Sequence, residues 1–277
     1  MTVADALRSA AAQFTSDSAR LDAELLLCHL LGVNRSWLYA WPDKALTPAQ
    51  QQRFDVLVAR RTAGEPVAHI LGEREFWSLK LTVTPDTLIP RPDTELLVEQ
   101  ALRLLPEHTA LRVADLGTGS GAIALAIARE RPHCRVVATD RSEAALAVAQ
   151  ANAVCNQIGN VEFRQGRWCE ALGDELFDLI VANPPYIAAD DPHLAQGDVR
   201  FEPRAALVAG HDGLDDIRQI AHEARDHLHN RGWLLLEHGY LQGGWVAEIL
   251  QKNGYENITT WRDLSGNERV TGGRVGG

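Results

Sequence analysis

Hydrophobic and polar residues follow a helical period at the start of the chain. From Ser18 to Leu31 leucines recur at the spacing of an amphipathic helix, and Gly32 follows as a stop signal. Thr47 before Pro48 has the pattern of an N-cap followed by proline at the first helical position, which predicts a second helix. Residues 1–73 are therefore predicted to form a small helical bundle domain.

The period changes between residues 74 and 90. The stretch FWSLKLTV alternates and is rich in aromatic residues, which favours a strand pair or an extended linker over a helix. The next segment, IPRPDTE, carries Pro90 and Pro92, which fix two backbone angles and bias the preceding residues toward extended conformations. A helix through Leu96 is expected to follow this stiff loop.

From Leu111 onward apolar strands alternate with helices. The successive segments are LRVADLG, AIALAIARE, RVVATD, EAALAVAQANA, VEFRQG, DLIVANPP, a helix near Ile217 to Leu228, and WLLLEHG. This order predicts an α/β fold with a mostly parallel sheet, helices on both faces, and ligands outside the carboxyl ends of the strands. The last segment predicts a hairpin with Ser265 and Gly266 at its turn, which adds an antiparallel edge. Residues 91–277 are expected to form this one domain.

Charge and composition narrow the functional classes. The net charge is −10, and residues 1–90 carry 9 Lys+Arg against 10 Asp+Glu, which leaves 18 against 27 for the rest. Because tight sequence-independent binding to nucleic acid depends on basic side chains, no stable nucleic-acid binding is expected. The N-terminus lacks a signal-peptide pattern and no apolar run is long enough to span a membrane, so a cytoplasmic protein without membrane partners is expected. The four cysteines have no C-x-x-C spacing and are expected to be reduced thiols.

A glycine-rich turn joins the first long apolar strand to its helix. Such a turn lets the backbone approach a ligand closely and offers amides at a helix N-terminus. Asp140 follows Gly121 by nineteen residues, at the end of the next strand, where a carboxylate can accept hydrogen bonds from both hydroxyls of a ribose. A strand-end helix cap is the alternative for Asp140. The predicted cofactor-binding residues of the turn are Gly117, Thr118, Gly119, Ser120 and Gly121.

Trp168 follows the next strand, where a flat aromatic ring can pack against an adenine. A tryptophan of the hydrophobic core is the alternative. Arg167, and not an acid that could accept from the adenine amino group, precedes this tryptophan. Recognition of the amino group by this loop is therefore open.

The most specific motif is Asn183-Pro184-Pro185-Tyr186, at the end of the apolar strand DLIVA. A planar NH₂ group is a poor nucleophile because its lone pair is delocalised, so an enzyme that alkylates it must hold both hydrogens and aim the nitrogen. The Asn183 side-chain oxygen and the Pro184 carbonyl can supply the two acceptors, and Tyr186 offers a ring against the substrate plane. The motif predicts Asn183, Pro184 and Tyr186 as catalytic residues and all four residues as substrate-binding; a plain proline turn is the alternative.

Other chemistries have little support in the sequence. The histidines of HEARDH lack the spacing of a zinc-protease helix, and no metal site is expected. A Gly-x-Ser-x-Gly nucleophile motif is absent, and no histidine is assigned as a general base.

These segments together resemble the HemK/PrmC family of release factor glutamine methyltransferases over essentially the whole length. The segments that carry the resemblance are GEPVAHILGEREFWSLKLTVTPDTLIPRPDTE, DLGTGSGAIALA, ANPPYI, DPHLAQGDVRFEP and NERVTGGR. The resemblance implies a class I S-adenosylmethionine methyltransferase with a Rossmann-like sheet and an N-terminal domain that grips the substrate protein. It further implies methylation of the glutamine of the Gly-Gly-Gln motif in class 1 peptide chain release factors.

By the same resemblance the glycine turn, Asp140, Trp168 and Asn183 contact S-adenosylmethionine, and Asn183 to Tyr186 hold the glutamine. For Arg91, Asp93, Thr94 and Glu95 of the IPRPDTE loop, helix capping is an alternative to substrate contact. Three other functions stay open at this point: methylation of another protein glutamine, such as one of a ribosomal protein; methylation of an exocyclic amine of adenine or cytosine in nucleic acid; and cofactor binding without activity.

Overall fold

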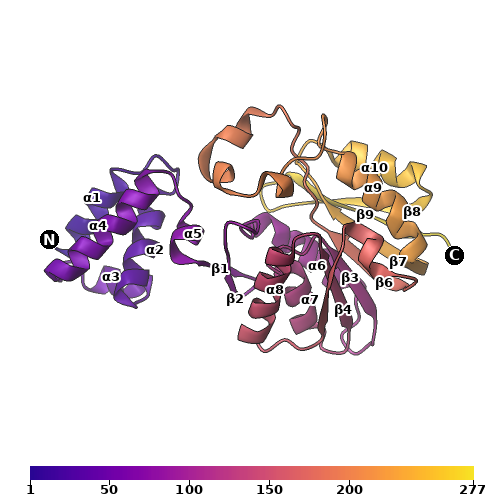
Figure 1. Ribbon diagram of the computed structural model, residues 1–277, viewed down its shortest axis with the longest axis horizontal. Helices are drawn as coiled ribbons and strands as arrows, with labels where there is room; N and C mark the ends of the chain where they lie inside the picture. The colour runs from indigo at the N-terminus through magenta and orange to yellow at the C-terminus, as the bar shows by residue number, and fades with distance from the viewer. The chain divides into compact units, whose positions relative to one another are not determined.

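A computed structural model describes residues 1–277 and contains two compact units (Figure 1). The first unit comprises Met1–Glu73 together with His193–Phe201, and the second comprises Arg74–Pro192 together with Glu202–Gly277. The short segment of the first unit is thus inserted in the sequence of the second. The sequence predicts that this segment lies within the domain of residues 91–277, and no local pattern indicates that it packs with the helical bundle.

The first unit is a bundle of short helices. Gly32 ends α2 in the left-handed conformation, and Thr47 and Gln50 form a capping box at the start of α4, both where the sequence predicts helix ends. The core contains Leu7, Leu26 and Phe54, all nearly inaccessible to solvent. The helices are α1 (Val3–Ala11), α2 (Ala19–Leu31), α3 (Arg35–Ala40), α4 (Pro48–Thr62) and α5 (Val67–Leu71).

A buried arginine ties the inserted segment to this bundle. Arg61 Nε donates to Asp22 Oδ2 at 2.9 Å and its Nη1 donates to Asp198 Oδ1 at 2.7 Å. Arg200 donates to the Ala63 carbonyl oxygen at 3.3 Å. The segment contains η4 (Gly197–Phe201) and most of η3 (Pro192–Ala195).

The linker forms a strand pair, as the alternating pattern predicts: β1 (Glu73–Phe76) and β2 (Leu79–Thr82). Trp77 and Ser78 both have positive φ at the tight turn between them. Buried Asn152 accepts from the Thr82 N–H and donates to the carbonyl oxygens of Thr82 and Ser120. The hairpin is thereby linked to the glycine turn.

A seven-stranded sheet forms the centre of the second unit, in the order β5-β4-β3-β6-β7-β9-β8. The first five strands of that order are parallel, and β9 runs antiparallel to both of its neighbours, which confirms the predicted edge hairpin. The strands are β3 (Arg112–Leu116), β4 (Arg135–Asp140), β5 (Val161–Gln165), β6 (Phe177–Ala182), β7 (Leu228–Glu237), β8 (Tyr255–Arg262) and β9 (Glu268–Val275).

Helices cover both faces of this sheet, and strand residues alternate between two hydrophobic clusters. One cluster includes residues of α6 and α7 with Val181 and Leu235, and the other includes residues of α9 and α10 with Ala182 and Leu236. The α-helices are α6 (Glu95–Leu104), α7 (Ala122–Glu130), α8 (Glu143–Cys155), α9 (Asp215–Glu223) and α10 (Gly243–Lys252). Short 3-10 helices are η1 (Pro92–Thr94), η2 (Trp168–Leu172), η5 (Arg204–Ala206) and η6 (Ala224–His227).

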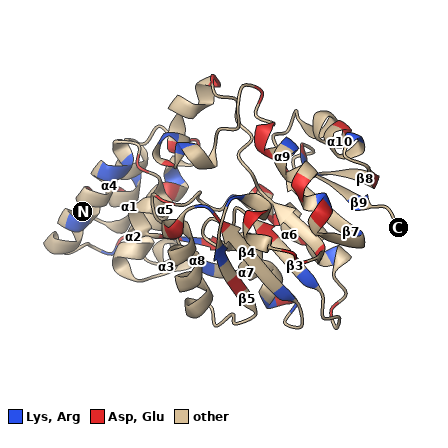
Figure 2. Ribbon diagram, turned by 45° about the vertical axis from the view of Figure 1, so that its right-hand side comes forward, with Lys and Arg blue, Asp and Glu red and all other residues tan.

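Charged residues of both signs are interspersed along the elements in the view of Figure 2. Many arginines form ion pairs within their own unit, such as Arg35 with Glu24 and Arg164 with Glu175. No helix in the structure combines the length and the apolar character that a membrane crossing requires.

Candidate active site

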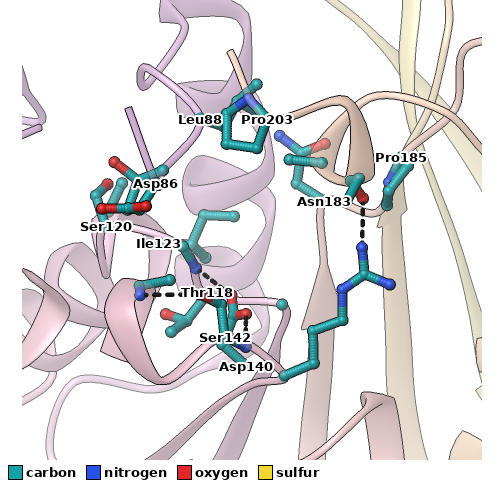
Figure 3. Close-up of a pocket in the computed structure, with 18 of the residues that line it drawn as sticks. Asp86, Leu88, Thr118, Ser120, Ile123, Asp140, Ser142, Asn183, Pro185 and Pro203 are labelled. Carbon is teal, nitrogen blue, oxygen red and sulfur yellow. Dashed lines mark hydrogen bonds between the residues drawn. The ribbon is translucent and has the colours of Figure 1, made fainter. Parts of the chain in front are cut away.

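A cavity of about 300 Å³ opens at the carboxyl ends of β3, β4 and β6, where the sequence predicts ligand binding. This volume is at the lower end of the range for small-molecule sites, roughly 300–1,000 Å³. In Figure 3, Asp86 and Ser120 lie on one side of it and Asn183 and Pro185 on the other.

The glycine turn forms one wall in a backbone conformation that glycine adopts readily and other residues rarely. Gly117 and Gly119 have φ of +74° and +56°, and the amides of Gly117 and Thr118 donate to the Thr139 carbonyl oxygen. A Cβ atom on Gly117 would lie 2.9 Å from the ring of Trp168. The turn thus brings bare backbone to the cavity and leaves room for the indole.

Asp140 is bonded to the turn through its carboxylate. One oxygen accepts from the Gly119 N–H and the other from the Ser142 N–H, each at 2.9 Å (Figure 3). The Ser142 side chain, and not Asp140, caps α8 by accepting from Ala145 N. Each carboxylate oxygen can accept more than one hydrogen bond, so Asp140 can still bind hydroxyl groups of a ligand in the cavity.

A second acid, Asp115, lies beneath the turn and is fully buried. Its Oδ2 accepts from the Thr118 hydroxyl at 2.6 Å and from Ala124 N at 3.1 Å, while Oδ1 has no partner. Burial, together with the nearby Asp140 charge, raises the pKa of Asp115 to about 7. Through its two hydrogen bonds Asp115 holds the glycine turn to the start of α7.

Trp168 lines the cavity, with its indole N–H donating to Asp216 Oδ1 at 3.2 Å. The same oxygen accepts from Arg167 Nη2 at 3.1 Å. Arg167, which occupies a position where an acid could accept from an adenine amino group, is thus ion-paired with Asp216 of α9. Asp216 lines the cavity, although sequence reasoning did not identify it.

Asn183 lies in the opposite wall, directly after β6. Its Nδ2 donates to the Thr94 hydroxyl oxygen at 3.3 Å. Thr94 is buried, and it also lines the cavity. The Asn-Pro-Pro-Tyr motif and the IPRPDTE loop are therefore in direct contact.

The rest of the motif packs around this position. Pro184 and Pro185 are buried, and Pro185 lines the cavity. The Tyr186 carbonyl oxygen accepts from Gln242 Nε2 at 3.0 Å. Burial and the charge of Glu237 raise the pKa of the Tyr186 hydroxyl above its ordinary value, so this phenol stays protonated near neutral pH.

The polar residues of the IPRPDTE loop do not cap its helices. Neither η1 nor α6 has a side-chain cap bond, contrary to the capping alternative. Asp93 forms an ion pair with Arg269 of β9 at 3.0 Å, and Glu95 accepts from the Trp77 N–H at 3.0 Å.

Arg91 is paired with the buried Glu202, whose other oxygen accepts from Ile89 N. These contacts join the IPRPDTE, FEP and NERVTGGR segments.

The structure brings most of the predicted site residues together. Gly121, Pro184 and Tyr186 do not line the cavity; a Cβ on Gly121 would instead lie 3.1 Å from Ala149 Cβ of α8. Of the IPRPDTE residues for which substrate contact and helix capping were both open, Arg91 and Thr94 line the cavity, and Asp86 lines it without any signal in the sequence. The predicted residues that line the cavity are Gly117, Thr118, Gly119, Ser120, Asp140, Trp168, Asn183 and Pro185.

The cavity suits a ligand that carries hydroxyl groups and positive charge better than one with a pyrophosphate. Of the arginines in its lining, Arg91 is paired with Glu202, Arg167 is paired with Asp216, and Arg141 donates to the Ala205 carbonyl oxygen. Asp140 and Asp86 have no ion-paired arginine among the contacts of the site. These acceptors are consistent with S-adenosylmethionine, which carries ribose hydroxyls, an ammonium group and a sulfonium.

Comparison with known proteins agrees with this geometry. Residues 5–72 match the family model described as PrmC N-terminal domain, and residues 92–199 match that of the methyltransferase small domain. A crystal structure of a methyltransferase from Pyrococcus furiosus has the same fold, with a TM-score of 0.55 and 20% identity over 79% of this chain and 97% of that one.

Relatives of known name are much closer in sequence. The release factor glutamine methyltransferase of Pseudomonas aeruginosa is 58% identical over 94% of this chain and 94% of its own length. The protein of the same name from Coxiella burnetii is 51% identical over 100% of both chains. These matches confirm the resemblance found in the sequence, and the chain belongs to the family of release factor glutamine methyltransferases.

Proposed function

We propose that this chain transfers a methyl group from S-adenosylmethionine to the side-chain amide nitrogen of a glutamine, that of the Gly-Gly-Gln motif in class 1 peptide chain release factors. The observation that carries the reaction is the position of Asn183, in the wall of a cavity whose other wall is the glycine turn with Asp140. The substrate is supported by the names of the full-length relatives. Site-resolved methyl transfer to a release factor tests both.

The reaction requires that the amide nitrogen be aimed. Asn183 Oδ1 and the Pro184 carbonyl oxygen each accept one N–H of the substrate amide. Pro184 itself does not line the cavity, but it lies between Asn183 and Pro185, which do, and the buried prolines hold the acceptors in place. When bound, S-adenosylmethionine supplies a methyl group activated by a positively charged sulfur. The nitrogen forms a bond to that carbon as the sulfur–carbon bond breaks.

One proton must leave the nitrogen after this step. Tyr186 is unsuited to accept it as a phenolate, because its raised pKa keeps the hydroxyl protonated. Alkylation makes the N–H acidic, so water can accept the proton. The residues of this chain therefore bind and align the substrate amide and the cofactor, and they need not provide a general base.

The cofactor is assigned to the first wall of the cavity. In this proposal Asp140 accepts from the ribose hydroxyls, Gly117 to Gly121 approach the methionine portion, and Trp168 packs against the adenine. Asp216 supplies the carboxylate that the loop itself lacks. Its Oδ1 accepts from Trp168 and Arg167, which leaves its Oδ2 for the ligand. This oxygen can accept from the adenine amino group.

Replacing Asp216 by asparagine is expected to weaken cofactor binding about 10-fold, as for one hydrogen bond to a charged group. Calorimetric titration with S-adenosylmethionine measures the change. Asp215→Asn is the matched control, since this neighbouring acid is exposed and pairs with Arg218. Equal affinities of the two variants would exclude Asp216 from adenine recognition.

The helical unit is proposed to bind the release factor, with residues 1–73 as its main part. Removing these residues should lower kcat/KM for intact release factor by about 10-fold or more, while affinity for the cofactor stays unchanged because the cavity is lined by the second unit alone. A short Gly-Gly-Gln peptide serves as the control substrate. If peptide methylation falls equally, the loss reflects damage to the catalytic unit, for instance through the inserted segment, and the binding role is contradicted.

A further inference from the structure

Glu237 and Asn183 occupy equivalent places at the ends of neighbouring strands. Ala182, the last residue of β6, pairs with Leu236 of β7 in the parallel register. The next residues are Asn183 and Glu237, so their Cα atoms are about one strand spacing apart, roughly 4.8 Å. No role was assigned to Glu237 from the sequence.

The alternation of side chains places both residues toward α6. Val181 and Leu235 belong to the hydrophobic cluster that contains α6, whereas Ala182 and Leu236 belong to the cluster on the opposite face. Because the side chains alternate, Asn183 and Glu237 point to the same side as Val181 and Leu235. Thr94, which precedes α6, is bonded to Asn183 there.

Glu237 is almost fully buried, with 1% of its surface exposed, and its Oε2 has no hydrogen-bond partner. The side chains of Thr94 and Asn183 are the hydrogen-bonding neighbours of the Glu237 carboxyl group as a whole, and they favour its charged form. Charged and titratable groups that face it are Arg269 of β9, Asp93 of η1 and Tyr186 after β6. Burial outweighs the favourable contacts and raises the pKa of Glu237 to about 7.

An ionised carboxylate accepts hydrogen bonds but cannot donate them, whereas an asparagine amide has a donating end and an accepting end. When Glu237 is ionised, the end of Asn183 that faces it must therefore be the NH₂ group, which is the group that donates to Thr94 in the structure. The opposite orientation would bring Oδ1 against the carboxylate oxygens and leave the NH₂ group toward the cavity. Only the first orientation offers Oδ1 to a substrate N–H.

We propose that Glu237 is a positioning residue for methyl transfer: together with Thr94 it fixes the side-chain amide of Asn183 so that Oδ1 faces the substrate nitrogen. This inference rests on the proposed function and assigns a role to two residues outside the Asn-Pro-Pro-Tyr motif. Glu237 acts through Asn183 and touches neither substrate nor cofactor.

The direct test is Glu237→Gln, which keeps the size of the side chain but adds a donor that can bond Asn183 Oδ1 and so permits the wrong orientation. Single-turnover methylation of release factor at saturating cofactor should slow by roughly 10- to 100-fold, the range for partners that orient a reacting group. Affinity for S-adenosylmethionine, measured by calorimetry, and the midpoint of thermal unfolding should be little changed.

A double-mutant cycle separates positioning from a merely structural effect. In an Asn183→Ala background, Glu237→Gln should cause no further loss, because there is no amide left to orient. If the two substitutions slow the reaction independently, so that their effects multiply, Glu237 does not act through Asn183 and the proposal is wrong. Wild-type rates in the single variant would contradict it equally.

The pH dependence gives a second readout. The orienting form is the carboxylate, so the wild-type rate at saturating cofactor should rise with pH through about 7. Glutamine does not titrate, so this rise should be absent in Glu237→Gln. If the rate of that variant still rises with pH, another group is responsible for the rise. Saturating cofactor is needed because the pKa of Asp115, beneath the cofactor turn, is also raised to about 7.

Thr94 variants keep the proposal testable should Glu237→Gln fail to fold. Thr94→Val removes the hydroxyl and should slow the reaction, whereas Thr94→Ser keeps the hydroxyl and should retain the rate. In the Asn183→Ala background, Thr94→Val should cause no further loss of rate. Equal rates for valine and serine variants would refute the network. A wild-type enzyme that does not methylate release factor at all would instead refute the proposed function.

Discussion

Asn183→Ala is expected to lower the rate of methyl transfer by about 10²- to 10³-fold, the loss seen when one preorganised hydrogen-bonding group of an active site is removed. The structure gives the reason: Asn183 lies in the cavity wall with its Nδ2 held by Thr94, so alanine removes the acceptor without opening the core. The measurement is single-turnover transfer of labelled methyl to release factor.

Two controls give this experiment its meaning. Affinity for S-adenosylmethionine should change little, because most of the proposed cofactor contacts come from the glycine turn, Asp140 and Trp168, and Asn183 supplies only one. Asn230→Ala, at an exposed asparagine of β7, should retain full activity. Undiminished turnover in Asn183→Ala would overturn the account in which Asn183 and Pro184 hold the two substrate hydrogens.

Asp140→Ala should weaken cofactor binding by on the order of 100-fold, corresponding to about 3 kcal/mol. The substitution removes the proposed acceptor of the ribose hydroxyls and also leaves the Gly119 and Ser142 amides without their carboxylate partner. The turn would then lose its shape as well as a ligand contact. Equilibrium dialysis or calorimetry with S-adenosylmethionine measures the affinity.

The matched control for Asp140 is Glu143→Ala, an exposed acid of the following helix. This variant should bind the cofactor as the wild type does. Rates at saturating cofactor should recover more completely in Asp140→Ala than in Asn183→Ala, because only Asn183 is assigned to the substrate amide. Unchanged affinity in Asp140→Ala would contradict the ribose assignment.

The fold follows from local signals that agree with one another. Apolar strands, glycine turns and helices alternate from Leu111 onward, and this pattern is enough to predict a mostly parallel sheet. Thr47 and Gly32 mark helix ends that the structure has at those residues. The tight turn of the Ser265-Gly266 hairpin predicts the antiparallel edge in the same way.

Contacts between distant segments could not be predicted in that way. Glu202 follows Arg91 by 111 residues, and no periodicity connects them. Asp216 is an ordinary acid of a helix N-terminus until the fold brings it to Trp168. The packing of His193–Phe201 with the helical unit likewise depends on ion pairs such as Arg61 with Asp198, which only the folded chain reveals.

The position of Glu237 in the sequence is compatible with a place near the ligand site. It ends the apolar strand WLLLE, and a carboxylate at the carboxyl end of a parallel strand lies at the edge where such sheets bind ligands. What the sequence lacks is the strand order: only the pairing of β6 with β7 makes Glu237 a neighbour of Asn183.

The most direct test of the central claim is transfer of labelled methyl from S-adenosylmethionine to three acceptors: a class 1 release factor, the same factor with the glutamine of its Gly-Gly-Gln motif replaced, and duplex DNA. The account predicts label on the unaltered factor alone, located on that glutamine by mass spectrometry. Label on DNA, equal label on the altered factor, or no label on any acceptor would contradict it.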